Sequence, residues 1–287
     1  MDGSWENLIS LNSHAEPTFG VLAPARELFE ADTRKGWWNS LDYADALQKD
    51  TFPLPMTADR EGYYGEHHFS YWASGLSDTN DLLAAAQKFD VPIDSFLDFG
   101  CASGRVVRHF GVQHPEVRTF GCDINRLHVE WCNRYLPNSV TVFQNHSIPT
   151  LPLPDNSISM MSAYSVFTHI EAFESSWLME MRRILKPGGL AWITVHTDLT
   201  LKAMDENWPL FNAVNRHPQR SELISTSNEF SGDRLVLRYR SDKSYSSNVF
   251  YKREYLERTW SRFFKILEFR HRFPRYQDVL ILQKIAS

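Results

Sequence analysis

Hydrophobic and polar positions follow a regular alternation from about residue 95 onward. Short apolar runs predict strands over Ser95–Phe99, Val117–Cys122, Val140–Phe143, Ile158–Tyr164 and Leu190–His196. Between them, apolar residues at helical spacing predict helices over Ser103–Gln113, Asn125–Tyr135 and Glu171–Leu185. Strands that alternate with helices are typical of a parallel sheet with helices on both faces.

Two segments lie outside this alternation. Residues 1–75 are irregular and rich in aromatic and acidic residues, with short helices predicted at 22–31 and 40–49. A longer helix is predicted from a cap at Asp78 or Thr79 to Phe89. The second segment covers about 198–250, where the periodic pattern weakens.

The C-terminal region predicts a helix over Lys252–Arg262 and strands over Phe264–Phe269 and Asp278–Gln283. Because the connection between these strands is too short for a crossover helix, the last strand should enter the sheet antiparallel to the others. We therefore expect an α/β fold with a doubly wound, mostly parallel sheet of seven strands and an antiparallel last strand.

Composition narrows the class of protein. Of the 287 residues, 43% are hydrophobic, which excludes a wholly disordered chain. The net charge of −5 disfavours a protein that coats nucleic acid. Charge is uneven, with −9 over residues 1–90 and +8 over 234–276. We expect no membrane span and no signal peptide. Three cysteines without a C-x-x-C pair disfavour a zinc site and favour a cytoplasmic location.

The stretch from Leu97 to Arg105 joins a strand to a helix through a turn of small residues. Gly100, Ala102 and Gly104 let a ligand approach the backbone beside the N–H groups of the helix N-terminus. Arg105 stands where a dinucleotide fingerprint needs a third glycine, which disfavours a nicotinamide dehydrogenase. Asp98, two residues before Gly100, suits a ligand that carries an ammonium group.

A second acid, Asp123, ends the next predicted strand. A carboxylate at that place can accept hydrogen bonds from both ribose hydroxyls. An aspartate after a strand is more often a turn residue or a helix cap. Its spacing from the glycine turn makes ribose binding the better interpretation.

Four segments in this order resemble the class I S-adenosylmethionine (SAM)-dependent methyltransferases. They read LDFGCASG at 97–104, GCD at 121–123, PLPDNSIS with SVFTHI between 152 and 170, and RILKPGGL at 183–190. The resemblance covers roughly residues 77–197. It implies a Rossmann-like methyltransferase domain over 76–287, preceded by a lid or substrate segment over 1–75 and interrupted by a substrate cap at about 198–250.

The resemblance also implies a cofactor site for SAM. Gly100, Cys101, Ala102 and Gly104 would form the turn around the methionine part, with Asp98 facing its amino group. Asp123 would hold the ribose, Ile124 would pack on adenine, and Asn145 or its neighbour His146 would read the adenine edge. Ala163 and Tyr164 would flank the sulfonium, and Tyr71 or Trp72 would close over the methionine. Ala102 departs from the commoner glycine, and its methyl group predicts a negative φ at this position.

Methyl transfer to a hydroxyl or a protonated amine benefits from a general base, and histidine titrates in the useful range. His169, after the fourth strand of the alternation, is the leading candidate, with a cap or packing residue as the alternative. His196, at the end of the next strand, is the second candidate. Glu66-His67-His68 has no third metal ligand at a recognisable spacing, so we expect no metal site.

These observations favour a SAM-dependent methyltransferase that acts at oxygen or nitrogen of a small-molecule acceptor. One alternative is an RNA or protein methyltransferase that uses the basic strip Arg234–Tyr276, although the net charge of −5 disfavours a nucleic-acid partner. The other is a cofactor-binding partner protein without catalysis, which the acids and glycines of the turn disfavour.

Overall fold

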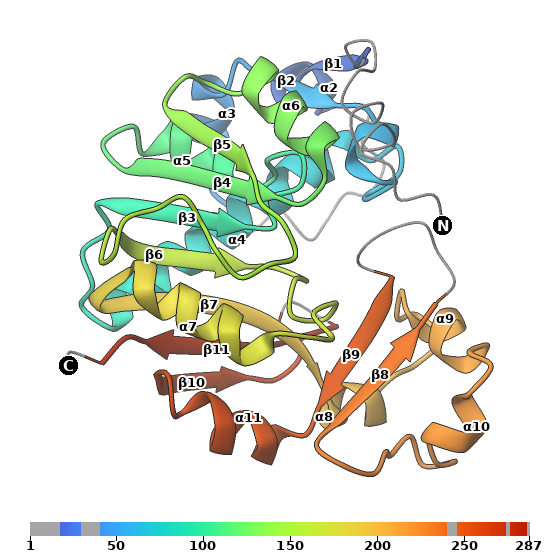
Figure 1. The fold of residues 1–287 in the computed structure, drawn as a ribbon. Coiled ribbons are helices and arrows are strands. Elements are labelled where there is room, and N and C mark those ends of the chain that lie inside the picture. The colour runs from blue at the N-terminus through green and yellow to red at the C-terminus, as the bar shows by residue number, and fades with distance from the viewer. Residues whose placement is uncertain (1–17, 30–40, 240–245, 274–275, 286–287) are drawn as a thin grey trace, which may run out of the picture.

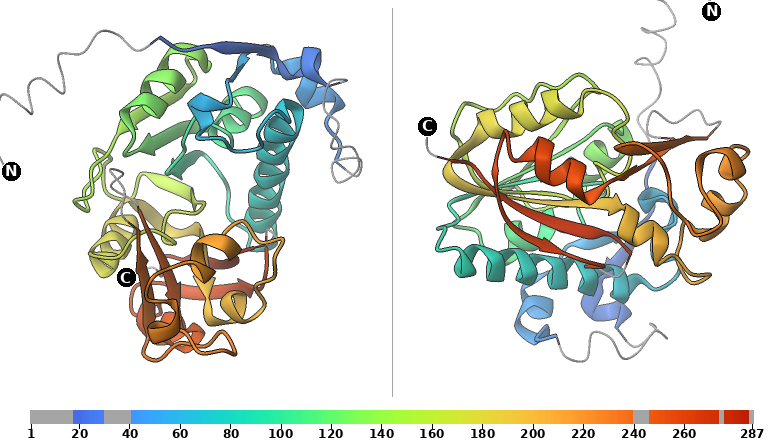
Figure 2. Two further views of the ribbon diagram at one scale, coloured as in Figure 1. Left: turned by 90° about the vertical axis from the view of Figure 1, so that its right-hand side faces the viewer. Right: turned by 90° about the horizontal axis from the view of Figure 1, so that it is seen from below.

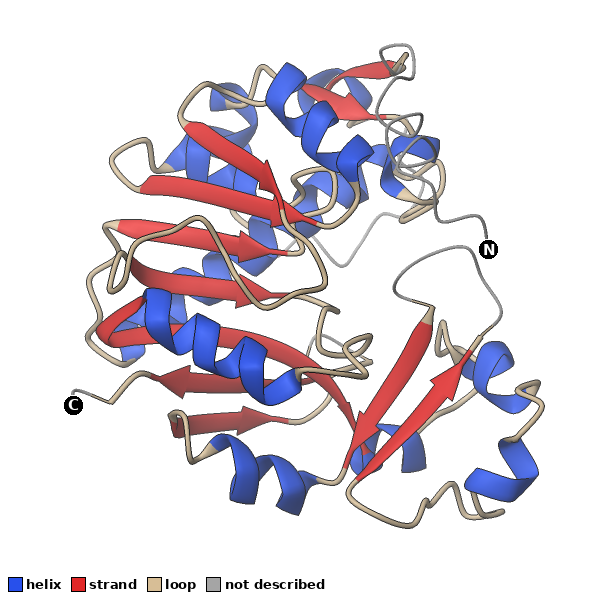
Figure 3. Ribbon diagram, in the orientation of Figure 1, coloured by secondary structure: helices blue, strands red, loops and turns tan. Residues whose placement is uncertain are grey.

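One mixed sheet organises the residues that the computed structural model describes, namely 18–29, 41–239, 246–273 and 276–285. Its strands follow the order β10-β11-β7-β6-β3-β4-β5 (Figure 1). Their bounds are β3 Ser95–Phe99, β4 Arg118–Asp123, β5 Val140–Gln144, β6 Ile158–Ala163, β7 Leu185–Thr197, β10 Lys265–Arg270 and β11 Asp278–Gln283. Neighbours from β5 to β7 are parallel, whereas β11 is antiparallel to both β7 and β10 (Figure 3). The predicted α/β fold with an antiparallel last strand is confirmed.

Helices cover both faces of the sheet (Figure 2). One face carries α4 His68–Lys88 and α5 Val107–Gln113, and the other carries α7 Glu174–Ile184 and α11 Arg253–Trp260. Side chains of β3 alternate between the two faces of the sheet. Phe96 packs in the core under α4 and α5, and Leu97 packs in the core under α7 and α11. The helix α6 Arg126–Tyr135 contacts β4 and β5. No helix in the described ranges is long and apolar enough to cross a membrane.

The segment inserted after β7 adds two strands beside the sheet. It comprises α8 Asp198–Lys202, α9 Phe211–Asn215, α10 Arg220–Leu223, β8 Arg234–Arg238 and β9 Ser247–Tyr251. β9 pairs in parallel with the end of β7 at His196 and Thr197, and β8 pairs antiparallel with β9. Its aromatic residues Trp208, Phe230 and Phe250 fill a small core of their own.

The helix predicted from Asp78 or Thr79 begins at His68 instead. Neither residue acts as a cap. The Asp78 carboxylate pairs with Arg105 at 2.5 Å, and the Thr79 hydroxyl donates to the carbonyl of Gly75 at 2.9 Å within the helix. The first turns of α4 bury aromatic side chains against the N-terminal segment, so tertiary packing extends the helix across the expected boundary after residue 75.

Other element boundaries also differ from the prediction. The helix after β3 begins at Val107 rather than Ser103, because the intervening residues form the glycine turn. The predicted helix at 22–31 is strand β1 Val21–Pro24 followed by α2 Ala25–Leu28, and its residues 30–31 lie outside the described ranges. The predicted helix at 40–49 is α3 Ala44–Lys49, with residue 40 outside those ranges. β1 pairs with β2 Pro53–Pro55, and η2 Ala58–Arg60 follows.

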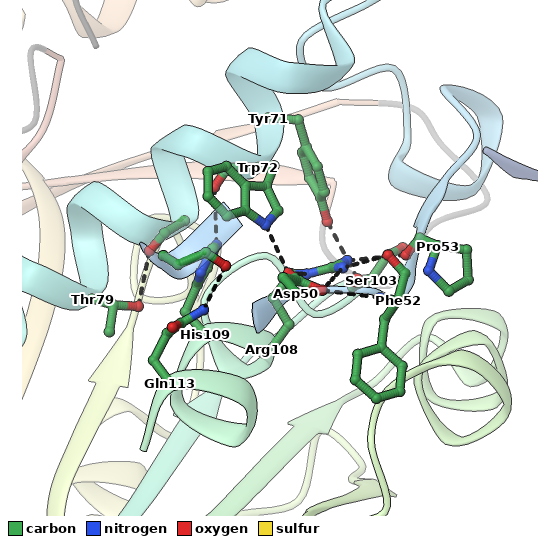
Figure 4. A network of polar contacts seen from close by, with 12 residues as sticks. Asp50, Phe52, Pro53, Tyr71, Trp72, Thr79, Ser103, Arg108, His109 and Gln113 are labelled. Carbon is green, nitrogen blue, oxygen red and sulfur yellow. Dashed lines mark hydrogen bonds and ion pairs between the residues drawn. The ribbon is translucent and has the colours of Figure 1, made fainter. Parts of the chain in front are cut away.

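A buried ion pair fastens the N-terminal segment to α5 (Figure 4). Arg108 donates through Nε and Nη2 to both carboxylate oxygens of Asp50, at 2.8 and 2.9 Å, and both side chains are fully buried. Its guanidinium also donates to the carbonyls of Phe52 and Pro53, and Trp72 Nε1 donates to Asp50 at 2.7 Å. Burial by itself raises the pKa of Asp50, but Arg108 outweighs burial and lowers it. The Asp50 carboxylate is therefore ionised. It joins the end of α3 to Trp72 of α4 and Arg108 of α5.

Replacing Asp50 with alanine should lower the free energy of unfolding by about 3–5 kcal/mol, because it leaves the Arg108 charge buried without its partner. Asp45→Ala is the matched control. Asp45 pairs with Lys49 at 2.7 Å but its side chain is 76% exposed, so its loss should cost less than about 1 kcal/mol. Urea denaturation of the two variants measures the difference. Equal losses would show that the buried pair contributes no more than a surface pair.

Candidate active site

A cavity of about 410 Å³ opens at the carboxyl edge of the sheet, where β3, β4, β5 and β6 end. Its lining includes most of the residues expected for a cofactor site and the first candidate base, namely Asp98, Gly100, Cys101, Ala102, Asp123, Ile124, Asn145, His146, Tyr164, Tyr71 and His169. Gly104, Ala163 and His196 are not in the lining. Residues far apart in the sequence therefore converge on one site, as expected for an open α/β sheet.

The turn after β3 depends on left-handed backbone. Gly100 has φ 80° and Gly104 has φ 80°, and Ala102 between them has φ 45°. The negative φ expected for Ala102 is wrong. Its N–H donates to Asp123 Oδ2 at 2.8 Å, and this bond holds the peptide in the left-handed conformation.

The two glycines meet different needs. A Cβ at Gly100 would lie 2.4 Å from Val166 Cγ2, on the cavity side of the turn. A Cβ at Gly104 would lie 2.6 Å from Leu136 Cδ1, on the side packed against α6. Gly100 therefore keeps the cavity open, whereas Gly104 permits close packing beneath the turn.

Asp123 anchors the turn and faces the cavity. Besides the bond from Ala102, its Oδ1 accepts from the N–H of Asn125 at 2.8 Å and lies 3.7 Å from His128 Nδ1. Each carboxylate oxygen can accept two hydrogen bonds, so capacity remains for a ligand hydroxyl. Asn125 in turn caps α6 by accepting from Leu127 N at 3.0 Å. Asp123 thus combines the turn role and the ligand-facing position that were considered for it.

Asp98 is a buried carboxylate at the end of β3. Ser162 Oγ donates to its Oδ1 at 2.7 Å. Burial raises the pKa of Asp98 to about 6, and the opposing effects of Ser162 and Arg105 only partly offset this. Arg105 is held by Asp78 and lies 5.5 Å from the ring centroid of Tyr164, another wall of the cavity. A cation placed beside Asp98 would relieve the cost of its burial.

Tyr71 rather than Trp72 lines the cavity. Its hydroxyl donates to the carbonyl of Ser103 in the turn at 3.3 Å, and Arg60 lies 4.8 Å from its ring centroid. Trp72 instead donates its Nε1–H to Asp50 of the buried ion pair. On the opposite side, Asn145 donates its N–H to the carbonyl of Asp123 at 3.1 Å and its side-chain NH₂ to the carbonyl of His146 at 3.2 Å.

His169 combines burial with a defined tautomer. Its Nδ1 lies 2.6 Å from the carbonyl oxygen of Ser247, which can only accept, so Nδ1 carries the proton of the neutral ring. Burial lowers the pKa of His169, and the bond to Ser247 and the charge of Glu61 only partly oppose this. The ring is therefore neutral near pH 7, and Nε2 is its basic nitrogen.

The other candidate histidines lie elsewhere. His196 stacks on Phe250 with ring centroids 5.1 Å apart and meets the edge of Trp208 at 5.4 Å. Burial lowers the pKa of His196 to about 3, and the structure does not bring it to the cavity. His68 contacts Arg60, with Nδ1 2.6 Å from Nη2. Within the described ranges, no group of histidine, cysteine, aspartate and glutamate could hold a metal ion.

Several lining residues were not predicted as site residues. They come from the N-terminal segment, from the loop between β6 and α7 and from α7 itself, and they include Arg60, Glu61, Tyr63, Val166, Glu171, Phe173 and Trp177. Residues 165–170 lie in a segment that carried the resemblance, so its position after β6 could have identified them. The N-terminal residues carried no such signal, because only the tertiary fold brings them to the sheet edge.

The inserted segment supports this loop from behind, and none of its described residues lines the cavity. Besides accepting from His169, Ser247 donates its hydroxyl to Glu171 Oε2 at 3.0 Å. Arg238 Nε donates to the same oxygen at 2.6 Å. Val249 N donates to the carbonyl of Thr168 at 2.8 Å. The β8–β9 hairpin therefore sets the position of the candidate base.

Ala102→Gly should raise the free energy of unfolding by about 0.5–1 kcal/mol, because glycine adopts the left-handed conformation without the Cβ clash. Ala191→Gly is the matched control. Ala191 is a buried residue of β7, where loss of the methyl group and added chain entropy should destabilise by about 1 kcal/mol. Chemical denaturation measures both. Destabilisation by Ala102→Gly would contradict the observed φ.

Comparisons with known proteins point to a methyltransferase domain. Residues 97–193, which run from β3 into β7, match the methyltransferase domain family. An uncharacterized methyltransferase of Schizosaccharomyces pombe is 27% identical over 152 residues, which are 50% of this chain and 52% of that protein. The chain thus spans about half the length of the curated relative it matches.

Two solved structures share the fold. A SAM-dependent methyltransferase from Methanosarcina mazei has a TM-score of 0.50 and 18% identity, and the match covers 71% of this chain and 98% of the other. The 1,6-didemethyltoxoflavin-N1-methyltransferase of Burkholderia thailandensis has a TM-score of 0.50 and 13% identity, covering 80% and 85%. That enzyme was solved with 1,6-didemethyltoxoflavin and S-adenosylhomocysteine (SAH). The match over residues 97–193, together with the strand order and the glycine turn, identifies this part of the chain as a methyltransferase domain with the class I SAM-dependent fold.

Proposed function

We propose that this chain transfers the methyl group of SAM to an oxygen or nitrogen atom of a small-molecule acceptor. The observation that carries the proposal is the convergence of Asp98, Asp123 and His169 on one cavity. The first two are acids suited to the cofactor, and the third is a neutral histidine suited to accept a proton.

The residues present fit the chemical groups of SAM. Asp98 offers a buried carboxylate to the ammonium group, and Asp123 offers its remaining acceptor sites to the ribose hydroxyls. Ile124 provides an apolar surface for adenine, and Asn145 and His146 provide polar groups for its edge. Tyr71 would close the methionine end. When bound, SAM supplies a methyl group already activated by a sulfonium.

The protein's task is then to orient the acceptor and exclude water. His169 would take the acceptor's proton on Nε2, while Ser247 holds the ring through Nδ1. The β8–β9 hairpin keeps this histidine from rotating away. An acceptor that is already neutral and nucleophilic would need to be positioned by the site but would not need to transfer a proton to His169.

A small acceptor is favoured over RNA because part of the basic strip is neutralised in place. Five of its nine arginines pair with nearby acids: Arg234 with Glu174, Arg238 with Glu171, Arg253 with Glu257, Arg258 with Asp233 and Arg270 with Glu268. Those pairs reduce the charge that the strip could offer to a phosphate backbone. The small-molecule methyltransferase of Burkholderia thailandensis, which shares the fold, is consistent with this choice.

Incubation of the protein with methyl-tritiated SAM and a cellular extract, split into metabolite, RNA and protein fractions, tests the proposal. We expect label in the metabolite fraction, with a mass increase of one methyl group in the product. Label confined to the RNA or protein fraction would contradict a small-molecule acceptor.

Cofactor affinity should fall as the pH drops below about 6. Asp98 must be ionised to hold the ammonium group, and because its pKa in the free protein is raised to about 6, protonation competes with binding below that value. Isothermal titration with SAM between pH 5 and 7 should show affinity weakening toward about tenfold per pH unit. Asp98→Asn should bind weakly throughout and lose the dependence. A parent profile flat to pH 5 would contradict this assignment.

His169→Asn should lower turnover by about 10²–10⁴-fold and leave SAM affinity unchanged, since asparagine keeps a polar side chain but accepts no proton. His196→Asn is the control, because His196 lies outside the cavity lining. Its turnover per folded molecule should stay near that of the parent. Near-parental turnover of His169→Asn would assign the histidine to positioning alone.

A further inference from the structure

Two strongly exposed aromatic side chains border the cavity. Tyr63 is 59% exposed and Phe173 is 63% exposed, although both belong to the lining. Tyr63 comes from the N-terminal segment, and Phe173 comes from the loop between β6 and α7. Apolar surface left exposed at the mouth of a cavity is typical of a site that a ligand covers. The mouth therefore presents two rings, one from each wall.

The backbone around both rings is strained. Phe173 has φ 60° and ψ 21°, a left-handed conformation that is unfavourable for an aromatic residue. It precedes α7 as the N-cap, yet its side chain caps nothing, and glycine or asparagine would suit that position better. Beside Tyr63, Tyr64 has φ 63°, whereas Gly62 and Gly65 adopt positive φ without strain. The strained residues are therefore Phe173 itself and Tyr64, the neighbour of Tyr63.

The size of the cavity places the acceptor at this mouth. Its volume of about 410 Å³ lies toward the lower end of the roughly 300–1,000 Å³ typical of ligand pockets. A bound cofactor that reaches from Asp98 to Asn145 would occupy most of the interior. The acceptor would then lie beside His169, with Val166 and Ile170 as apolar neighbours. Tyr63 and Phe173 are exposed aromatic side chains of the lining that could contact it.

We propose that the acceptor is a planar aromatic molecule with a ring hydroxyl, held at the mouth by Tyr63 and Phe173. Aromatic rings gain from offset or edge contacts with another flat ring, which a saturated acceptor cannot make. This inference rests on the proposed function.

The transfer step balances with the residues present. The hydroxyl oxygen forms a bond to the methyl carbon while the carbon–sulfur bond breaks and leaves its electron pair on sulfur. The hydroxyl proton passes to Nε2 of His169, which the Ser247 carbonyl keeps as the basic nitrogen. The products are an aromatic methyl ether and SAH.

Binding of two matched alcohols tests the inference. With the protein saturated by SAH, isothermal titration compares 2-naphthol, which is planar, with decahydro-2-naphthol, which has the same carbon skeleton but is saturated. We expect 2-naphthol to bind at least tenfold more tightly. Equal affinities, or no binding of 2-naphthol, would overturn the inference. Failure of SAH itself to bind would instead contradict the proposed function.

Variants separate recognition from folding. Phe173→Gly removes the ring and relieves the left-handed backbone, so its melting temperature should be equal or higher while 2-naphthol binds about 3- to 10-fold more weakly. Tyr63→Ala should weaken binding similarly, and Tyr63→Phe should not. Met179→Ala is the control, since Met179 is 61% exposed on α7 and outside the lining. SAH affinity should be unchanged in all four. Unaltered 2-naphthol affinity in Phe173→Gly and Tyr63→Ala would refute the role of the rings.

Discussion

The buried ion pair between Asp50 and Arg108 is the interaction on which the assembled site depends. It joins the N-terminal segment to α5, the helix that follows the cofactor turn. From that anchor the chain reaches Asp59, whose carbonyl accepts a hydrogen bond from Ser103, and then the wall residues Arg60 and Tyr63. Two charges without water are tolerated there because each is satisfied by the other and by neighbouring polar groups. The position of one wall of the cavity thus depends on the Asp50–Arg108 pair, which lies outside the cavity lining.

Two buried carboxylates in the site differ because their partners differ. Asp123 accepts two backbone N–H bonds, so it shapes the turn and keeps acceptor capacity where it lines the cavity. Asp98 has a single hydroxyl donor, and burial raises its pKa, so it is suited to bind a cation. The same side chain therefore provides two kinds of recognition at adjacent strand ends.

The two candidate histidines show how packing decides a role. His169 follows β6 and His196 lies near the end of β7, and burial lowers the pKa of both. His169 is fixed by Ser247 and lines the cavity, whereas His196 is enclosed by Phe250 and Trp208. The inserted segment contributes to both environments. It acts on the site through the loop it supports, since none of its described residues lines the cavity.

Local pattern in the sequence was enough to predict the parallel sheet, its antiparallel last strand and the turn from Asp98 to Gly104, because periodicity and small-residue spacing are properties of neighbouring residues. It could not predict the φ of Ala102, which depends on a hydrogen bond to Asp123 on another strand. It also missed the start of α4 and the wall at Arg60 and Tyr63. Those features arise from long-range packing, since the burial of Asp50 against Arg108 brings distant segments together. The tertiary structure alone decided which residues of the N-terminal segment line the cavity.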